Sequence, residues 1–187
     1  MAIEIDDAEE MIAVCQENDV LLQVAFPVRF APLAQHVKQL LDDQVIGEVL
    51  AINSTNHGKM PGGWFVDKSL SGGGAAIDHI VHVTDLIRWM LKQEVTEVYA
   101  ELATRYYDLD VEDCGMVMME LESGAIVSLD PSWSRPKAFP TWGDVTMKFV
   151  GTKGNLTVDM FRQNILFSSN ENNQQIQLPW AEDMDQG

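Results

Sequence analysis

The sequence predicts an α+β fold in which helices cover one face of an open, mostly antiparallel β-sheet. Helical periodicity occurs at three places, all within the first 90 of the 187 residues. After residue 95 the chain consists of short strand-like segments, several joined by tight turns such as the one at Ser123 and Gly124. Strands joined by tight turns pair antiparallel, and the apolar face of such a sheet packs against helices.

The N-terminal segment predicts a helix that leads directly into a strand. Asp6 or Asp7 is suited to cap a helix over residues 6–18. Four apolar side chains recur there at helical spacing: Ala8, Met11, Ile12 and Cys15. The apolar run at residues 20–26 is then typical of a buried strand in an α/β layer.

A second helix is expected over residues 33–43, after Pro27 and Pro32. Its apolar stripe is formed by Leu33, Val37, Leu40 and Leu41. A strand with alternating polarity follows over residues 48–57, and then a long loop rich in glycine over residues 59–74. Loops of this length in compact domains are usually functional.

A third helix is expected from the three glycines at 72–74 to about residue 90, and the rest of the chain to form strands. The expected strands cover residues 95–105, 115–122, 125–131, 144–150, 155–159, 164–168 and 174–178.

Composition restricts the class of function. The formal net charge of -17 repels nucleic-acid phosphates and anionic membranes, so neither is an expected partner. The 46% of hydrophobic residues suffices for a core, but no apolar run is long enough to span a bilayer. Cys15 and Cys114 are the only two cysteines and lack C-x-x-C spacing, so two reduced thiols are expected rather than a disulfide or a zinc site, and the first residues do not form a signal peptide. A cytoplasmic location is therefore expected.

The third helix carries the residues best suited to chemistry. At about 100° per residue, Asp78, His82 and Asp85 lie on one face, whereas His79 lies off it and is expected to be structural or exposed. Asp78 is one turn before His82, so its carboxylate is placed to orient the imidazole and favour its protonated form. Such a pair suits general acid–base catalysis. Two alternatives remain open: a solvated helix face, and a metal site formed by Asp78, His82 and Asp85.

The segment PGGWFVDKSLSGGGAAIDHIVHVTDLIRWML (residues 61–91) resembles the corresponding region of the Gfo/Idh/MocA family of NAD(P)-dependent oxidoreductases. The pattern G-G-G-A-x-x-D-x-x-x-H-x-x-D, with a Trp-Phe pair ahead of it, carries the resemblance. It continues through EVTEVYAE, VEDCGMVMMELESGAIVSLDPSWSRP and GTKGNLTV, and so covers nearly the whole chain. The resemblance implies an enzyme that transfers hydride between a sugar or polyol and NAD or NADP.

The resemblance also implies roles for individual residues. Asp78 and His82 match the family's catalytic aspartate and histidine, with His82 accepting the hydroxyl proton and Asp78 orienting the substrate. No metal ligand is implied. The other implied contacts are, to the cofactor, Arg29 and Trp64, and, to the substrate, His57, Lys59 and Asp85.

In this family a Rossmann domain binds the dinucleotide, and a second domain supplies substrate contacts and oligomer interfaces. The resemblance therefore implies that residues 1–30 are the last helix–strand remnant of a nucleotide-binding domain. Residues 31–187 would be a substrate-binding and homo-oligomerisation domain that is incomplete at its C-terminus. Neither a G-x-G-x-x-G fingerprint nor the family's E-K-P tripeptide is present.

We therefore expect the chain to supply acid–base groups to an oxidoreductase and to be inactive alone. The alternative is a non-catalytic assembly module that dimerises through its open sheet.

Overall fold

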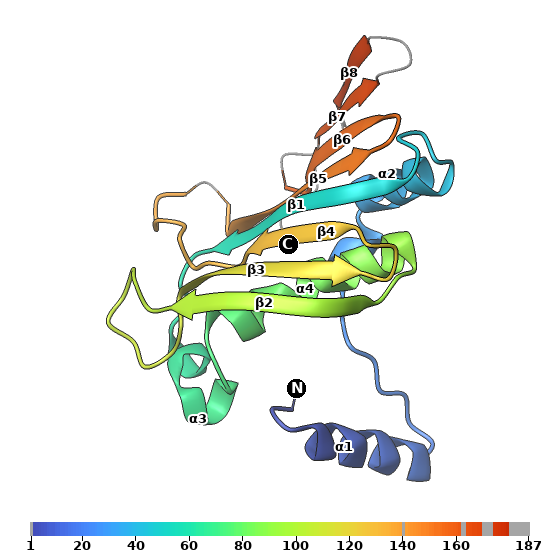
Figure 1. Cartoon of the computed structure of the whole chain (residues 1–187). Helices are drawn as coiled ribbons and strands as arrows, with labels where there is room; N and C mark the ends of the chain where they lie inside the picture. Colours follow the sequence, from blue (N-terminus) through green and yellow to red (C-terminus); the bar gives the residue numbers. More distant parts are fainter. Residues whose placement is uncertain (1, 140, 162–163, 170–173, 180–187) are drawn as a thin grey trace.

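The fold is built on an eight-stranded open sheet, seen in a computed structural model that describes residues 2–139, 141–161, 164–169 and 174–179 (Figure 1). The strand order is β2-β3-β4-β1-β5-β6-β7-β8, with β1 and β4 parallel and the other neighbours antiparallel. The strands are β1 (Val49–Gly58), β2 (Val95–Ala103), β3 (Cys114–Leu121), β4 (Ile126–Asp130), β5 (Gly143–Gly151), β6 (Gly154–Asp159), β7 (Asn164–Ser169) and β8 (Gln174–Pro179). The predicted open, mostly antiparallel sheet is confirmed.

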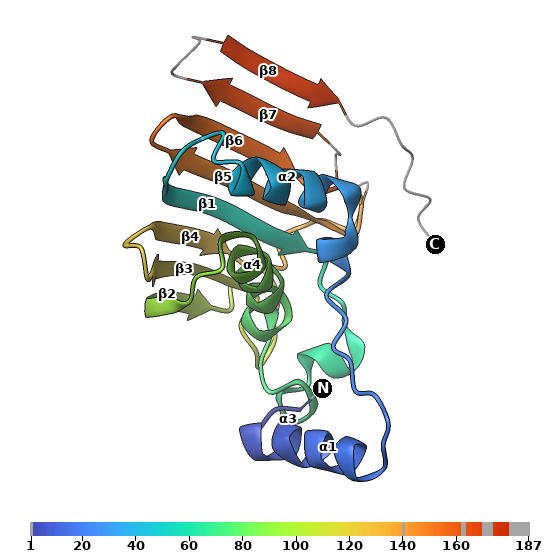
Figure 2. The same cartoon turned by 90° about the vertical axis from the view of Figure 1, so that its right-hand side faces the viewer.

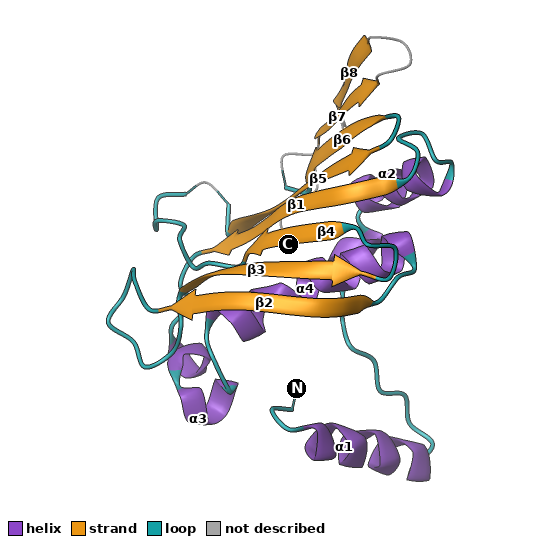
Figure 3. Cartoon of the chain, viewed as in Figure 1, coloured by secondary structure: helices purple, strands orange, loops and turns teal. Residues whose placement is uncertain are grey.

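Helices α2 (Pro32–Asp42) and α4 (Ala75–Leu91) pack against one face of this sheet (Figure 2). The alternation of buried and exposed side chains along the strands explains why the helices lie on one face, because every second residue of a strand points to the same face. In β5, Met147 and Phe149 point to the helices and are fully buried, whereas Lys148 between them is exposed. The predicted coverage of one face is confirmed for α2 and α4, whereas α1 and α3, also purple in Figure 3, lie away from the sheet.

The N-terminal helix α1 (Ile5–Glu17) is present, but the buried strand predicted at residues 20–26 is wrong. This segment has no strand structure, and Leu21 in it is fully exposed at 101%. A strand needs a neighbour for its backbone N–H and C=O groups, and the described strands pair with one another instead. Figure 1 shows the segment as a blue connection between α1 and the rest of the chain. α1 itself buries no residue.

Short helical turns occupy parts of the connections. The 3₁₀ turn η1 (Pro27–Phe30) precedes α2, while η2 (Gly63–Val66) and α3 (Lys68–Ser71) lie within the glycine-rich segment that was expected to be a loop. No helix in the described part of the chain is both long and apolar enough to cross a membrane.

The N-terminus of α4 is capped from a distant part of the chain. Gly74 precedes the helix and has no side chain to accept a hydrogen bond from its first N–H groups. Glu112, between β2 and β3, takes this role. Its Oε1 accepts from the N–H of Gly74 at 2.8 Å and of Ala76 at 3.2 Å, and its carbonyl oxygen accepts from Ala75 at 2.8 Å. A carboxylate at this position also interacts favourably with the helix dipole.

Replacing Glu112 with alanine is expected to lower the free energy of unfolding by roughly 0.5–2 kcal/mol, the usual effect of removing an N-cap. The measurement is urea unfolding followed by circular dichroism. Glu112→Gln keeps an acceptor at Oε1 and is expected to lose less stability. Equal losses in the two variants would contradict the capping role.

Candidate active site

Asp78 and His79 lie together near the start of α4, and Trp133 reaches them from the segment after β4. Trp133 Nε1 donates a hydrogen bond to Asp78 Oδ2 at 2.9 Å, and His79 Nε2 lies 3.2 Å from the same oxygen. Burial raises the pKa of the Asp78 carboxyl, but His79 and Trp133 outweigh burial and hold it below its ordinary value. Asp78 is therefore an ionised hydrogen-bond acceptor at neutral pH.

His82 is half-buried one turn further along α4, with its ring edge-on to Phe26 at a centroid distance of 6.2 Å. Burial lowers its pKa, and the charge of Asp78 compensates only in part. Asp78 thus favours the protonated form of His82, as expected, but burial outweighs its charge, and the side chain that lies against the carboxylate is His79. At neutral pH, His82 is a neutral imidazole that is able to accept a proton.

Two adjacent cavities border these residues. Asp78 lines one of about 300 Å³, together with Gly73, Gly74 and the stacked rings of Trp64 and Phe65, whose centroids are 4.0 Å apart. His82 lines a second cavity of about 570 Å³, which extends beneath α1 and residues 22–26. Ile77 lines both. The structure thus brings the implied cofactor contact Trp64 to the Asp78 cavity and places His82 beside it.

Arg29 and Asp85 bind each other. The guanidinium of Arg29, in η1, forms two hydrogen bonds to the carboxylate of Asp85 on α4, one of them from Nε to Oδ2 at 2.6 Å. This pair ties η1 to α4. Both charges are engaged within the chain, so the predicted contacts of Arg29 with a cofactor and of Asp85 with a substrate would have to share or break this ion pair.

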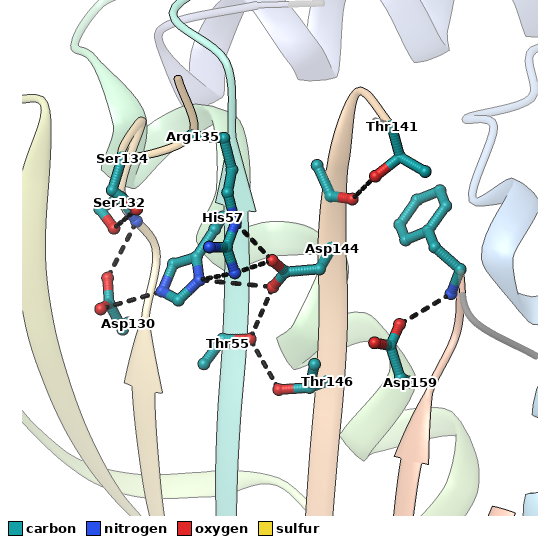
Figure 4. Close-up of polar contacts among 12 residues, drawn as sticks. Thr55, His57, Asp130, Ser132, Ser134, Arg135, Thr141, Asp144, Thr146 and Asp159 are labelled. Carbon is teal, nitrogen blue, oxygen red and sulfur yellow. Dashed lines mark hydrogen bonds and ion pairs between the residues drawn. The ribbon is translucent and has the colours of Figure 1, made fainter. Parts of the chain in front are cut away.

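His57 belongs to a different polar cluster, shown in Figure 4. Its Nε2 lies 3.0 Å from Asp130 and its Nδ1 lies 3.4 Å from Asp144, which also binds Arg135. The preceding residue, Asn56, points to α4 and donates to the carbonyl oxygen of His79 at 3.0 Å. Because side chains alternate along a strand, His57 points away from α4. The structure therefore does not bring His57 together with Asp78 and His82.

Lys59, the other candidate substrate contact, directly follows β1 and is half-buried. Its backbone N–H donates to the carbonyl oxygen of Trp142 at 3.2 Å. Within the described residues, no contact of its side chain with Asp78 or His82 is present.

The His57 cluster predicts a stability that falls at alkaline pH. Burial lowers the pKa of His57, but Asp130 and Asp144 outweigh burial and raise it to about 9. Because the folded pKa lies above the unfolded value of about 6.5, this stabilisation is complete below pH 6.5 and is lost as the pH rises through 9. Because Asp130 is partly exposed, solvent weakens its interaction with His57. The expected contribution to the free energy of unfolding is therefore on the order of 2 kcal/mol.

This loss is measured by urea unfolding at pH 7 and pH 10, with His57→Gln as the control that does not titrate. We expect the wild-type chain to lose more stability between the two pH values than the variant. Parallel losses in the two proteins would contradict the role of the imidazolium.

The alternative of a metal site receives no support from the geometry. Among the residues that the structure describes, no three His, Cys, Asp or Glu side chains lie close enough together to hold an ion. Asp78, His82 and Asp85 do not converge, since Asp78 contacts His79 and Asp85 contacts Arg29.

The structure is an open sheet with α4 on one face and with Asp78 and His82 near the start of that helix. Comparison with known sequences identifies the class of protein that has these features. A model of the GFO/IDH/MocA C-terminal domain matches residues 34–157 of the 187. The chain belongs to this family, whose members include oxidoreductases.

Individual relatives agree with this assignment. An uncharacterised oxidoreductase, YrbE, of Bacillus subtilis is 27% identical over 166 residues, covering 87% of this chain and 47% of that protein. The myo-inositol 2-dehydrogenase of Thermotoga maritima is 25% identical over 178 residues, covering 91% and 51%. The chain thus spans about half the length of these relatives.

A solved structure of levoglucosan dehydrogenase, in complex with NADH and levoglucosan, has the same fold. Its TM-score is 0.80 at 22% identity, covering 96% of this chain and 52% of the other.

Proposed function

We propose that this chain is the substrate-binding part of an oxidoreductase that transfers hydride between an alcohol carbon of a sugar or polyol and NAD(P). One observation carries the proposal: the ionised carboxylate of Asp78 borders a cavity of about 300 Å³, beside a neutral His82. A carboxylate that accepts hydrogen bonds from hydroxyls, next to an imidazole that accepts a proton, suits alcohol oxidation.

In this proposal His82 is the general base. Its unprotonated ring nitrogen takes the hydroxyl proton of the substrate while the adjacent carbon loses hydride, and it returns the proton in the reverse direction. Asp78 accepts a hydrogen bond from a substrate hydroxyl and thereby orients the reacting carbon. Sugar and polyol substrates are supported by the names of relatives, among them D-xylose 1-dehydrogenase of Haloarcula marismortui and scyllo-inositol 2-dehydrogenase of Bacillus subtilis.

The described residues fit one end of an NAD(P) molecule. Trp64 is 55% exposed at the Asp78 cavity and offers a flat surface for the nicotinamide ring, which supplies the hydride acceptor when the cofactor is bound. For the diphosphate, the glycine-rich segment between β1 and α4 lacks the G-x-G-x-x-G spacing of a dinucleotide-binding turn, and Arg29 is engaged by Asp85. Tight binding of the whole cofactor therefore requires a nucleotide-binding unit.

Residues 1–30 support the same proposal. In it, α1 and residues 20–26 belong to the nucleotide-binding unit, and the exposed apolar segment becomes a strand only beside that unit's sheet. Residues 31–187 then form the substrate-binding and oligomerisation domain.

The test measures NADH and NADPH binding and alcohol oxidation by the isolated chain on a panel of sugars and polyols. We expect sugar or polyol binding without turnover. Robust turnover would overturn the proposed dependence on a second unit, and no binding of any panel member would overturn the substrate class.

The sheet also favours the second candidate, an assembly module. The face of the sheet away from α2 and α4 exposes apolar side chains of β2, β3 and β4: Tyr99, Met116, Met118 and Ile126. A homo-oligomer that buries this face would remove them from water. A monodisperse monomer in size-exclusion chromatography with light scattering would exclude this candidate.

A further inference from the structure

Asp78 is held by side chains from two different parts of the fold. Trp133 is fully buried after β4, and its indole N–H donates to Oδ2 of Asp78. His79 approaches the same oxygen with Nε2 from the next position in α4. Because both donors reach one oxygen, the carboxylate is unable to rotate without losing both contacts.

His79 is itself fixed by β1. Its backbone carbonyl oxygen accepts from the side chain of Asn56, and its ring packs on Gly58, where a Cβ atom would come within 2.7 Å of Cε1. The residue is only 4% exposed, and within the described residues its Nδ1 has no hydrogen-bond partner. The polar contact made by the ring is therefore the one with Asp78.

These contacts leave the second oxygen of Asp78 available. Within the described residues Oδ1 accepts no hydrogen bond, although the side chain is 22% exposed and borders the cavity with Trp64 and Gly73. A carboxylate fixed through one oxygen presents the other in a single direction, which favours one ligand geometry.

We propose that Trp133 and His79 are positioning residues, which fix Asp78 through Oδ2 so that Oδ1 accepts a hydrogen bond from one hydroxyl of a sugar or polyol. The nature of the ligand rests on the proposed function, whereas the positioning of the carboxylate does not. Asp78 thereby orients the substrate through one hydroxyl, and His82, one turn away, accepts the proton of a different hydroxyl, the one on the reacting carbon.

Three variants separate this role from a purely structural one. Trp133→Phe removes the N–H and keeps a ring in the core, and His79→Leu removes the second donor. His79→Gln retains a donor near the position of Nε2. In carbon-13 NMR titrations of the 187-residue chain, we expect the pKa of the Asp78 carboxyl to rise in Trp133→Phe and His79→Leu and to stay low in His79→Gln. An unchanged pKa in the first two variants would overturn the proposal.

A further variant tests the contact with the core intact. In Asp78→Ala, the indole N–H proton resonance of Trp133 is expected to move upfield, because its hydrogen bond to a carboxylate is gone. If none of the five tryptophan indole resonances moves, the proposal is wrong, whether or not Trp133→Phe folds.

Titration of the same proteins with myo-inositol and D-xylose tests the ligand. Binding is expected to weaken roughly 10- to 100-fold in Trp133→Phe and His79→Leu and to recover in His79→Gln. The reason is that a carboxylate no longer held in place loses its hydrogen bond from the ligand, and a hydrogen bond to a charged group has an effect of this size. Unchanged binding in variants with a raised Asp78 pKa would overturn the positioning role. If the Asp78 pKa responds as expected but no form binds these two compounds or any other member of the sugar and polyol panel, the proposed function fails and the positioning of Asp78 stands.

Discussion

Replacing His82 with alanine is expected to lower kcat about 10²- to 10⁴-fold in an enzyme that combines this chain with a nucleotide-binding unit. The reason is that the half-buried imidazole is neutral and is the group that accepts the substrate proton in the proposed reaction. The site loses a base but little packing, so the melting temperature should change far less than the rate. The measurement is steady-state oxidation of a sugar or polyol that the enzyme accepts, with calorimetry alongside.

The pH profile provides the second readout for His82. A base acts only when unprotonated, and the lowered pKa of His82 keeps it unprotonated at pH values where an ordinary histidine is charged. We expect the acid limb of the kcat/KM profile to fall below pH 6.5 and to disappear in His82→Ala. His36→Ala, on α2, is the matched control. A wild-type rate in His82→Ala, or the same loss in His36→Ala, would reject the role of His82.

Replacing Gly74 with alanine is expected to lower the free energy of unfolding by about 3 kcal/mol, the upper part of the usual range for overpacking. A Cβ atom at this position would lie 1.9 Å from the backbone oxygen of Glu112. Backbone atoms have no alternative rotamer, so the start of α4 would have to move. That movement would also disturb the hydrogen bonds by which Glu112 caps the helix.

The adjacent glycine offers a matched control. A Cβ atom at Gly73 would meet the Cδ1 atom of Ile77 at 3.0 Å, and the end of a flexible side chain moves easily. Gly73→Ala is therefore expected to change stability by less than about 1 kcal/mol. Urea unfolding of both variants gives the comparison, and similar losses at the two positions would show that close approach to Glu112 is not the cause.

The fold could be predicted from the sequence because its elements are encoded locally. Alternation marks strands such as β5, and a tight turn at Gly124 joins β3 to β4. The failure at residues 20–26 has the opposite cause. An apolar run shows that a segment is able to form a strand, but pairing depends on a neighbour that local sequence does not reveal.

The candidate site was predictable only where its residues share one helix. Asp78 and His82 follow from the helical period, but the contacts of Asp78 do not. His79 lies about 100° away on the helical wheel, yet it reaches the carboxylate because adjacent side chains are able to lean together. Trp133 comes from 55 residues further along the chain and carries no local signal of this contact. The partners of His57, Asp130 and Asp144, lie on β4 and β5, and local sequence does not reveal which strands become neighbours of β1.

The parallel pairing of β1 with β4 has a consequence for how such a domain diversifies. Since the two strands run in the same direction, the segments that leave them emerge at a common edge, one carrying Trp64 and the other Trp133. Insertions or substitutions in the exit that carries Trp64 would reshape the cavity directly, whereas changes at the fully buried Trp133 would act on it through Asp78, and the paired strands would keep their register. A single arrangement of strands would thereby carry cavities of different shapes without any change in strand order.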